Sequence, residues 1–342
     1  MRVLVTGSDG YLGCLLAPYL MEAGHEITGL DTGFYRSGWL YNGQASLPRT
    51  KSNDIRRIGA RDLEDVEAVV HMAELSNDPL GQLLPEITHE INHKGSMRLA
   101  RACKSAGVAR FVYMSSCSVY GVAGEEDVTE SSPTNPQTAY ALCKTLVERD
   151  LADLADDSFS PTSLRNATAY GASPRMRFDI VLNNLAGLAW VHREIRMVSD
   201  GTPWRPLVHA LDICKAIDCV LKAPAEIVHN ETYNVGDSSQ NYRVRDIAEI
   251  VADVFPGCST SYGKLDPDNR GYRVSFDKIT KELPGFSCDW DAARGARQLR
   301  KLFERIGLTE AMFADRAFTR LKQLEHLLQT GQLDSSLFWV DA

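Results

Sequence analysis

The segment VTGSDGYLG, residues 5–13, constrains the fold more than any other part of this chain. It follows a short apolar run, RVLVT at 2–6, and leads directly into a stretch with helical periodicity. Because Gly7, Gly10 and Gly13 carry no Cβ, the backbone can turn tightly and the helix can pack closely on the strand. A strand, a glycine loop and a helix in this order are typical of the first unit of a parallel α/β sheet. The loop and the helix N-terminus can together receive a diphosphate.

Strand-like and helix-like segments alternate along the first half of the chain. Strands are expected at 2–6, 26–31, 68–73, 110–116 and 161–171, and helices at 11–24, 87–106 and about 138–155. This alternation predicts an α/β fold, a Rossmann-type doubly wound parallel sheet with helices on both faces.

The pattern becomes irregular after about residue 170, where Pro, Arg and Asn rise and the strands shorten. We expect residues 1–170 to form the sheet domain, which the chain rejoins at about 207–236. Segments 171–206 and 237–308 are expected to form a smaller mixed α/β part that binds the substrate. A helical C-terminal extension at 309–342 is expected to cap the core with its apolar face.

The composition excludes several classes of function. The 342 residues have a formal net charge of −8, so the chain lacks the broad basic face that attracts nucleic acids or anionic membranes. The chain opens on a strand-like segment, and its most apolar stretch, at 180–191, is interrupted by two asparagines. We therefore expect neither a secretory signal nor a membrane span. The eight cysteines include no C-x-x-C pair and are expected to be reduced thiols of a cytoplasmic protein.

Asp31 ends the second expected strand, 24 residues after Gly7. A carboxylate at that place can accept hydrogen bonds from the ribose hydroxyls of an adenine dinucleotide, and it would repel a 2′-phosphate. We therefore expect the first domain to bind NAD rather than NADP. Arg36 follows closely in the sequence and weakens that preference.

Tyr140 and Lys144, in TAYALCK, lie about one helical turn apart, so both side chains leave the same face. An ordinary phenol has a pKa of about 10 and is a poor base near pH 7. A cation about 4 Å away contributes roughly 4 kcal/mol toward its ionisation at an effective dielectric near 20. Such a phenolate can take a proton from a sugar hydroxyl while hydride leaves the same carbon. Ser115 or Ser116, at the end of the strand 110–116, can bridge the reacting oxygen to the phenol.

With these motifs the chain resembles the extended short-chain dehydrogenase/reductases, and among them the NAD-dependent sugar-nucleotide epimerases and dehydratases, such as the UDP-glucose 4-epimerases. The resemblance extends over nearly the whole length, to about residue 300. It rests on VTGSDGYLG (5–13), Asp31, DI (54–55), HMAE (71–74), INHKGS (91–96), SSCSVYG (115–121), YALCK (140–144), LRNATAYG (164–171), NNL (183–185), DGTPWRPLVHALD (200–212), YNVG (233–236) and DNRGYR (268–273). This set is specific for the family, but it does not identify the nucleotide or the sugar.

The resemblance implies roles residue by residue. Tyr140 matches the family's catalytic base, Lys144 its partner, and Ser116 the catalytic Ser or Thr. The implied cofactor-binding residues are Gly7, Gly10, Tyr11, Leu12, Gly13, Asp31, Asp54, Ile55, Ala73, Asn92, Ser115, Tyr140 and Lys144. The implied substrate-binding residues are Ser116, Asn166, Arg177, Asn184, Arg205 and Arg270. Arginines converging on a diphosphate make physical sense, because a planar guanidinium pairs bidentately with phosphate oxygens.

Cys117 and Ser118 stand where the family's 4,6-dehydratases carry an acidic pair. In those enzymes one carboxylic acid protonates the leaving hydroxyl and one carboxylate removes the C5 proton. Neither a thiol nor a hydroxyl is a strong acid–base group without help. The departure favours 4-epimerisation or simple oxidation or reduction at C4. The leading hypothesis is a 4-epimerase, which oxidises a nucleotide-activated hexose at C4 to a 4-keto intermediate and returns hydride to the other face.

Three alternatives remain open. Dehydration is one, because a perturbed Cys117 thiol is a candidate catalytic acid or base. A one-way 4-dehydrogenase or 4-reductase is another. The third is a dinucleotide sensor without catalysis, against which the Tyr140/Lys144 pair is the main argument.

No metal site is expected. HEINH, at 89–93, matches the H-E-x-x-H zinc signature, but a metalloprotease also needs a third ligand and an open cleft, and this segment instead overlies the family's helix after the third strand. Family members often dimerise through the helices after the third and fourth strands, here about 87–106 and 138–155. The resemblance therefore implies a homodimer.

Overall fold

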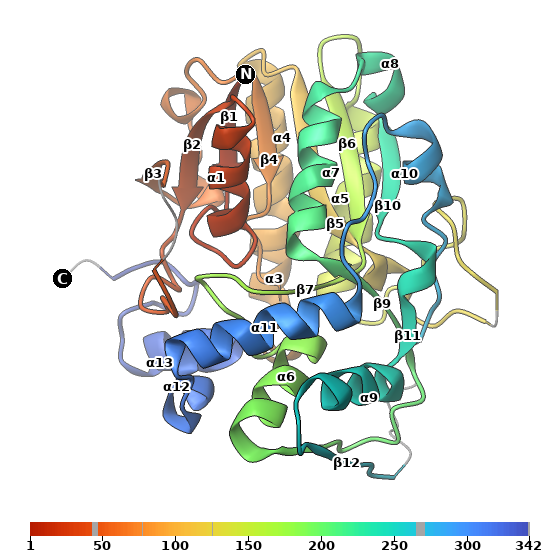
Figure 1. Ribbon diagram of the computed structural model, residues 1–342. Coiled ribbons are helices and arrows are strands. Elements are labelled where there is room, and N and C mark those ends of the chain that lie inside the picture. The colour runs from red at the N-terminus through yellow and green to blue at the C-terminus, as the bar shows by residue number, and fades with distance from the viewer. Residues whose placement is uncertain (43–46, 77, 125, 265–270, 341–342) are drawn as a thin grey trace.

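The computed structural model describes residues 1–42, 47–76, 78–124, 126–264 and 271–340 (Figure 1). The strands are β1 (Arg2–Thr6), β2 (Glu26–Asp31), β3 (Arg49–Ser52), β4 (Ala68–His71), β5 (Arg110–Ser116), β6 (Ser160–Asn166), β7 (Thr168–Tyr170), β8 (Glu194–Arg196), β9 (Trp204–His209), β10 (Glu231–Val235), β11 (Asn241–Arg243) and β12 (Ser259–Ser261). The α-helices are α1 (Gly13–Glu22), α2 (Asp78–Leu83), α3 (Pro85–His89), α4 (Ser96–Ser105), α5 (Ala139–Leu154), α6 (Val181–His192), α7 (Ala210–Lys222), α8 (Ala225–Val228), α9 (Val244–Val254), α10 (Asp277–Glu282), α11 (Ala292–Ile306), α12 (Glu310–Ala314) and α13 (Arg320–Gln329). Short 3₁₀ turns are η1 (Ile55–Arg57), η2 (Ala60–Asp62), η4 (Cys117–Tyr120), η5 (Ser238–Gln240) and η6 (Arg316–Phe318), and η3 (Glu90–Gly95) is a π-helical turn.

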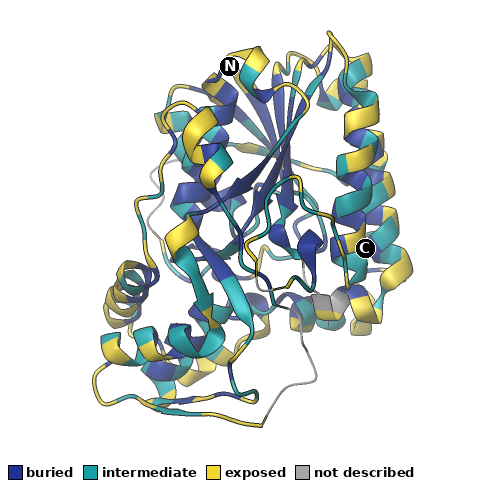
Figure 2. Ribbon diagram, turned by 90° about the vertical axis from the view of Figure 1, so that its right-hand side faces the viewer, coloured by how far each residue is buried: buried dark blue, intermediate teal, exposed yellow. Residues whose placement is uncertain are grey.

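The main sheet has seven strands in the order β10-β6-β5-β4-β1-β2-β3, and every pair is parallel. The predicted Rossmann-type fold is therefore confirmed. Along β1, Val3 and Val5 belong to an apolar cluster with α1 and α7, whereas Leu4 belongs to a second cluster with α4 and α5. Figure 2 shows the buried sheet between helices whose outer faces are exposed. Burial on both faces explains why strands such as RVLVT read as continuous apolar runs.

The chain moves in opposite directions from β1, with β2 and β3 on one side and β4 to β6 on the other. Such a reversal of strand order opens a crevice at the carboxyl ends of the two central strands, and ligands of doubly wound sheets bind there.

A smaller part of the protein lies at the carboxyl edge of the main sheet, in the lower half of Figure 1. It contains a three-stranded sheet, β11-β9-β7, a two-stranded sheet, β12-β8, and the mutually packed helices α6, α9 and α11. The strand expected at 161–171 is in fact two strands in different sheets. β6 ends at Asn166, opposite Val235 of β10, and β7 then pairs with β9. The chain returns to the main sheet through α7 and β10, within the predicted range 207–236.

The segment expected as one helix at 87–106 is α3, η3 and α4, and it begins at Pro85. In the π-helical turn η3 the backbone hydrogen bonds span one more residue than in an α-helix. Its Asn92 is completely buried, and the amide bonds both the N–H and the carbonyl of Leu75, at 2.8 and 3.0 Å. This helix therefore fixes the loop that follows β4.

The C-terminal extension is also broken, into α12, η6 and α13. Phe313 packs against Phe178, with ring centroids 4.8 Å apart, and so contacts the first apolar cluster. Leu324 and Leu327 belong to the second cluster. The extension therefore covers the apolar interior at two places rather than along one helical face.

The glycine loop adopts a conformation that excludes side chains. Gly7 has φ +75° and donates its N–H to the Leu30 carbonyl at 2.8 Å. A Cβ on Gly13 would overlap the Gly7 carbonyl oxygen and lie 2.6 Å from the Ser8 Cα. Leu12, the residue that caps α1, contributes no side-chain hydrogen bond. Within the described residues the N–H of Gly13, the first of α1, has no acceptor and is open to a ligand, whereas those of Cys14 and Leu15 bond the Gly10 and Leu12 carbonyls at 3.1 and 3.0 Å.

Gly13→Ala should force the loop apart, because the new methyl group meets backbone rather than a flexible side chain. We expect a lower thermal midpoint and at least a ten-fold loss of dinucleotide affinity, measured by differential scanning calorimetry and binding titration. Gly124→Ala is the control, since a Cβ there meets nothing within 4 Å. Equal behaviour of the two variants would contradict the steric argument.

Candidate functional site

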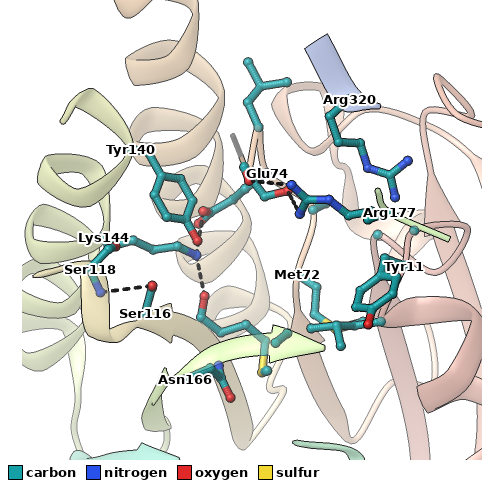
Figure 3. A pocket seen from close by; sticks show the side chains of 18 of the residues that line it. Tyr11, Met72, Glu74, Ser116, Ser118, Tyr140, Lys144, Asn166, Arg177 and Arg320 are labelled. Atoms are coloured by element: carbon teal, nitrogen blue, oxygen red, sulfur yellow. Dashed lines mark hydrogen bonds and ion pairs between the residues drawn. The ribbon is translucent and has the colours of Figure 1, made fainter. Parts of the chain in front are cut away.

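A cavity of about 660 Å³ opens at the carboxyl edge of the main sheet (Figure 3). The residues after β1, β2, β4, β5 and β6 line one side of it. The smaller part and the start of α13 line the other side. Elements from distant parts of the sequence therefore meet where the strand order of the sheet reverses.

The structure brings most of the predicted site residues together around this cavity. Those lining it are Gly7, Gly10, Tyr11, Leu12, Gly13, Asp31, Asp54, Ile55, Ala73, Ser115, Ser116, Tyr140, Lys144, Asn166, Arg177 and Arg205. Asn92, Cys117 and Asn184 do not line it. Arg270 lies outside the described residues.

Tyr140 and Lys144 project from the first turns of α5, whose N-terminus is capped by Thr138 through a 3.1 Å bond from the Ala141 N–H. The Lys144 Nζ lies 5.3 Å from the centre of the Tyr140 ring and 4.7 Å from that of Tyr113. Figure 3 shows the phenol end of Tyr140 directed toward the Lys144 ammonium. The predicted pair is thus assembled on one wall of the cavity.

Glu74, which is not among the predicted site residues, is the closest charged partner of Lys144. Its Oε2 lies 2.6 Å from the Lys144 Nζ, and its Oε1 accepts a 2.8 Å bond from the Tyr113 hydroxyl. Lys144 also donates to the Met114 carbonyl. The two charged side chains are only 4% and 2% exposed, so this is a buried ion pair.

Burial and charge act against each other in this pair. Burial raises the pKa of Glu74, and the Lys144 ammonium opposes that rise without cancelling it. Burial lowers the pKa of the Lys144 ammonium, but Glu74, with smaller contributions from Tyr140 and Glu148, raises it, and the net pKa of Lys144 is raised. One feature of the sequence could have identified Glu74. It is a charged residue that comes directly after the strand expected at 68–73.

The serines at the end of β5 have different surroundings. Ser115 is buried and donates to Glu148, whose carboxylate also holds Arg165 at 2.7 Å. The Ser116 Oγ accepts a 3.1 Å bond from the N–H of Ser118 and so caps η4. Within the described part of the chain its hydroxyl hydrogen has no acceptor, which leaves Ser116 better suited than Ser115 to bond a ligand oxygen.

The position of Cys117 does not support the acid–base role considered for it. The side chain is 1% exposed, and its Sγ donates to the Arg165 carbonyl at 3.1 Å. Burial raises the pKa of this thiol well above its usual range. Cys117 is therefore a neutral thiol turned away from the cavity.

Asn92 and Asn184 also differ from their expected contacts. The Asn92 amide is committed to the backbone of Leu75, so it shapes the cavity wall without reaching it. The Asn184 Nδ2 donates to the Phe178 carbonyl at 2.9 Å. Neither amide contacts the cavity directly.

At the other end of the cavity, Asp31 accepts bonds from the N–H groups of Asp9 and Gly33, at 3.0 and 2.7 Å. Burial raises the pKa of Asp31, and these two bonds oppose the rise. Arg36 does not line the cavity; it bonds Asp9 at 3.0 Å. The one cation that weakened the preference for NAD is thus engaged outside the cavity.

Asp54 is held in place by Arg56. The Asp54 carboxylate accepts from the backbone N–H of Arg56 at 2.8 Å and from its guanidinium at 2.7 and 3.0 Å. Together with the buried Ile55, it forms the wall next to the end of β2.

The smaller part contributes two of the predicted arginines. Arg177 pairs with Asp179 through bonds of 2.9 and 3.1 Å and donates to the Ser76 hydroxyl at 3.2 Å. Arg205, in β9, donates one bond to the Trp204 carbonyl and also lines the cavity. A third arginine, Arg320 of α13, lies next to Arg177 and was not anticipated.

Two further findings concern metal ligands and membrane-spanning helices. Among the residues that the structure describes, no group of His, Cys, Asp and Glu is placed to hold a metal ion. In the same part of the chain, no helix combines the length and the apolar character needed to cross a membrane.

Comparisons with known proteins give consistent results. The model of the NAD-dependent epimerase/dehydratase family matches residues 3–236. UDP-glucose 4-epimerase of Streptomyces lividans is 33% identical, over 73% of this chain and 80% of the relative. The solved structure of DesIV, a dTDP-glucose 4,6-dehydratase from Streptomyces venezuelae with NAD bound, is 26% identical with a TM-score of 0.79, over 91% of this chain and 100% of that one. MoeE5, solved with UDP-glucuronic acid and NAD, is 26% identical with a TM-score of 0.76, over 90% of this chain and 100% of that one.

Glu74→Leu should destabilise the protein strongly, because it leaves the Lys144 ammonium buried without its carboxylate. Removing one partner of such a pair costs about 3–5 kcal/mol of unfolding free energy, and adding Lys144→Met should recover much of that loss. Urea unfolding of the single and double variants measures both effects.

The exposed pair of Glu90 and Lys94 serves as the control. Glu90→Gln should change the unfolding free energy by about 0.5 kcal/mol or less. A cost for Glu74→Leu no larger than this would show that the Glu74–Lys144 pair does not bear on stability.

Proposed function

Since the chain belongs to the NAD-dependent epimerase/dehydratase family, we propose that it inverts a nucleotide-activated hexose at C4. The protein is an enzyme of a family that uses NAD. What distinguishes the proposed epimerase from the family's dehydratases is the direct return of hydride to the 4-keto sugar, with no elimination in between.

The residues present fit a dinucleotide. Gly7 and Gly13 shape a cradle that a Cβ would fill, and the Asp31 carboxylate retains lone pairs for ribose hydroxyls. We propose that Gly10, Tyr11, Leu12, Ala73 and Ser115 complete this contact, with Asp54 and Ile55 beside the adenine and Lys144 beside the nicotinamide ribose. NAD supplies the reversible hydride acceptor for the reaction.

The proton is handled by this chain's own side chains. Tyr140 takes the proton of the C4 hydroxyl and returns it after the 4-keto sugar has turned over in the cavity. Lys144 stabilises the ionised phenol by its charge, and Ser116 donates its unused hydroxyl hydrogen to the reacting oxygen. Glu74 holds Lys144 in place through the buried ion pair.

Nucleotide-sugar binding is proposed for Asn166, Arg177 and Arg205. The Asn166 Nδ2 is bonded to the Ser115 and Leu164 carbonyls, whereas its buried Oδ1 has no partner within the described residues. A donor on the substrate would satisfy it. The two arginines offer charge to the diphosphate. Asn184 and Arg270 remain predictions from the resemblance.

The observation that supports epimerisation over dehydration is the loss of an acidic pair after Ser116. Cys117 is buried and bonded to the Arg165 carbonyl, and Ser118 carries only a hydroxyl. Elimination of water needs an acid and a base beyond the redox pair. Tyr140, Lys144 and Ser116 suffice for epimerisation.

Dehydration is the second candidate, because Glu74 places a carboxyl group on the cavity wall. The 26% identity to a dTDP-glucose 4,6-dehydratase fits that alternative as well. A 4-dehydrogenase or 4-reductase would use the same residues without the return of hydride.

We also propose that the protein is a cytoplasmic homodimer. The eight cysteines are all free thiols, as a reducing compartment would keep them. The face of α5 away from Tyr140 and Lys144 carries Leu142, which is 45% exposed. Light scattering of wild type and Leu142→Asp tests the interface, since a monomer in both cases would contradict it.

Tyr140→Phe should lower turnover by about 10²- to 10⁴-fold, because it removes the group that transfers the proton. Tyr262→Phe is the matched control, since Tyr262 is exposed and bonds Glu249 away from the cavity. Steady-state rates with a panel of nucleotide hexoses measure the effect. Near-normal turnover of Tyr140→Phe on the true substrate would refute the mechanism.

Product analysis in D₂O separates the three reactions. Epimerisation should give the C4 epimer with no deuterium at C5 and no net NADH. Deuterium at C5 would identify a dehydratase, and accumulating NADH a 4-dehydrogenase.

A further inference from the structure

The C-terminal extension places a buried cation, Arg320, in the wall of the cavity. Arg320 is the first residue of α13 and only 4% exposed, yet it lines the cavity together with Thr319 and Leu321. In Figure 3 it descends from α13 toward Arg177, and Tyr11 of the glycine loop lies below Arg177.

Arg320 is held in this place from several directions. Its backbone N–H donates to the Asp179 Oδ2 at 3.3 Å, and its guanidinium lies 3.9 Å from the centre of the Tyr35 ring. Just before it, the Phe318 carbonyl accepts a 3.0 Å bond from the Phe178 N–H. Contact with an aromatic face orients a guanidinium without neutralising it.

The segment after α13 anchors the helix to the sheet domain. The Trp339 Nε1 donates to the Thr32 carbonyl at 2.7 Å, next to the end of β2. Arg56 donates to the Ser336 carbonyl at 2.7 Å and packs on the Phe338 ring at 3.7 Å. The extension thus wraps around the end of the cavity that Asp31 and Asp54 form.

The charges around Arg320 do not balance. Arg177 has its carboxylate in Asp179, at 2.9 Å. Across the residues that the structure describes, the Arg320 guanidinium has neither a hydrogen bond nor a carboxylate within 4.0 Å. Burial and the neighbouring Arg177 lower the pKa of Arg320 to about 10, so it stays protonated at neutral pH. A buried cation of this kind is costly unless a ligand supplies an anion.

The surroundings indicate which anion this is. The charge of Arg320 lowers the pKa of Cys14, in the first turn of α1, and the Asp31 carboxylate raises the pKa of Arg320. Arg320 therefore lies near both the helix start that follows the glycine loop and the carboxylate at the end of β2. A dinucleotide bound at these two places carries its pyrophosphate between them.

We propose that Arg320 binds the pyrophosphate of the dinucleotide from the side opposite the glycine loop, so that the C-terminal extension is part of the cofactor site. The glycine loop then supplies backbone N–H groups on one side and Arg320 a charged fork on the other. The proposal rests on NAD as cofactor and is independent of which reaction follows at C4.

The test compares Arg320→Gln with Arg316→Gln, an exposed arginine four residues earlier that does not line the cavity. Isothermal titration of purified protein, freed of bound nucleotide, is carried out with NAD, ADP, adenosine and UDP. Arg320→Gln should weaken NAD and ADP by about 10- to 100-fold and leave adenosine within two-fold, because one charge-assisted contact to phosphate is lost. Arg316→Gln should bind all four like wild type.

Other outcomes overturn the proposal in different ways. NAD and ADP binding within two-fold of wild type would show that Arg320 does not contact the pyrophosphate. Weaker UDP with unchanged ADP would assign the charge to the diphosphate of the sugar nucleotide. Equal losses for adenosine and ADP would show a structural effect on the pocket. None of these titrations requires turnover, so a failure here is distinct from a failure of the proposed epimerase activity.

Discussion

The parallel direction of the seven main strands is the constraint on which the rest of the molecule depends. The carboxyl ends of all seven strands lie at one edge of the sheet. Because the strand order reverses beside β1, this edge opens into a cavity. Four residues, each at or just after the end of a different strand, meet there for this reason: Gly7, Glu74, Ser116 and Asn166. The apolar clusters on both faces keep the strands in register, so the positions of these residues are set by packing far from the chemistry.

Lys144 illustrates how such a scaffold carries a charge into its interior. The ammonium is bonded to the Met114 carbonyl, paired with Glu74 and flanked by the rings of Tyr113 and Tyr140. Each contact offsets part of the cost of removing a cation from water. The consequence for function is that Tyr140 faces an ion pair and not an isolated ammonium. The potential at the phenol therefore depends on Glu74 as well as on Lys144.

The opposite wall of the cavity shows the complementary situation. Arg177 comes from the smaller part and pairs with a carboxylate two residues later, whereas Arg320 comes from the C-terminal extension and has no such partner in the described part of the chain. A wall with an unbalanced positive charge suits ligands that carry diphosphates, and both the cofactor and the proposed substrate do. The extension, expected only to cap the core, thus also contributes to the charge of the site.

Much of this could be predicted from local patterns. The glycine loop, the alternation of apolar segments and the spacing of Tyr140 and Lys144 depend on neighbours in the chain. They predicted the sheet correctly and placed Tyr140 and Lys144 on one face of a helix, as in α5. The division of 161–171 between two sheets could not be predicted, because Val235 and β9, which pair with the two halves, come much later in the sequence. Cys117 looked reactive by its position in the motif, and only packing showed its thiol turned to the Arg165 carbonyl.

The sequence by itself determined the fold class, the glycine loop and the Tyr140–Lys144 pair, since each follows from residue type and short-range spacing. The tertiary structure alone decided that Lys144 pairs with Glu74, 70 residues away, and that Arg320 reaches the cavity with no carboxylate partner among the described residues. The physical reason is that the net charge and burial of a group depend on what surrounds it in space, and those surroundings are assembled from segments that no local pattern connects.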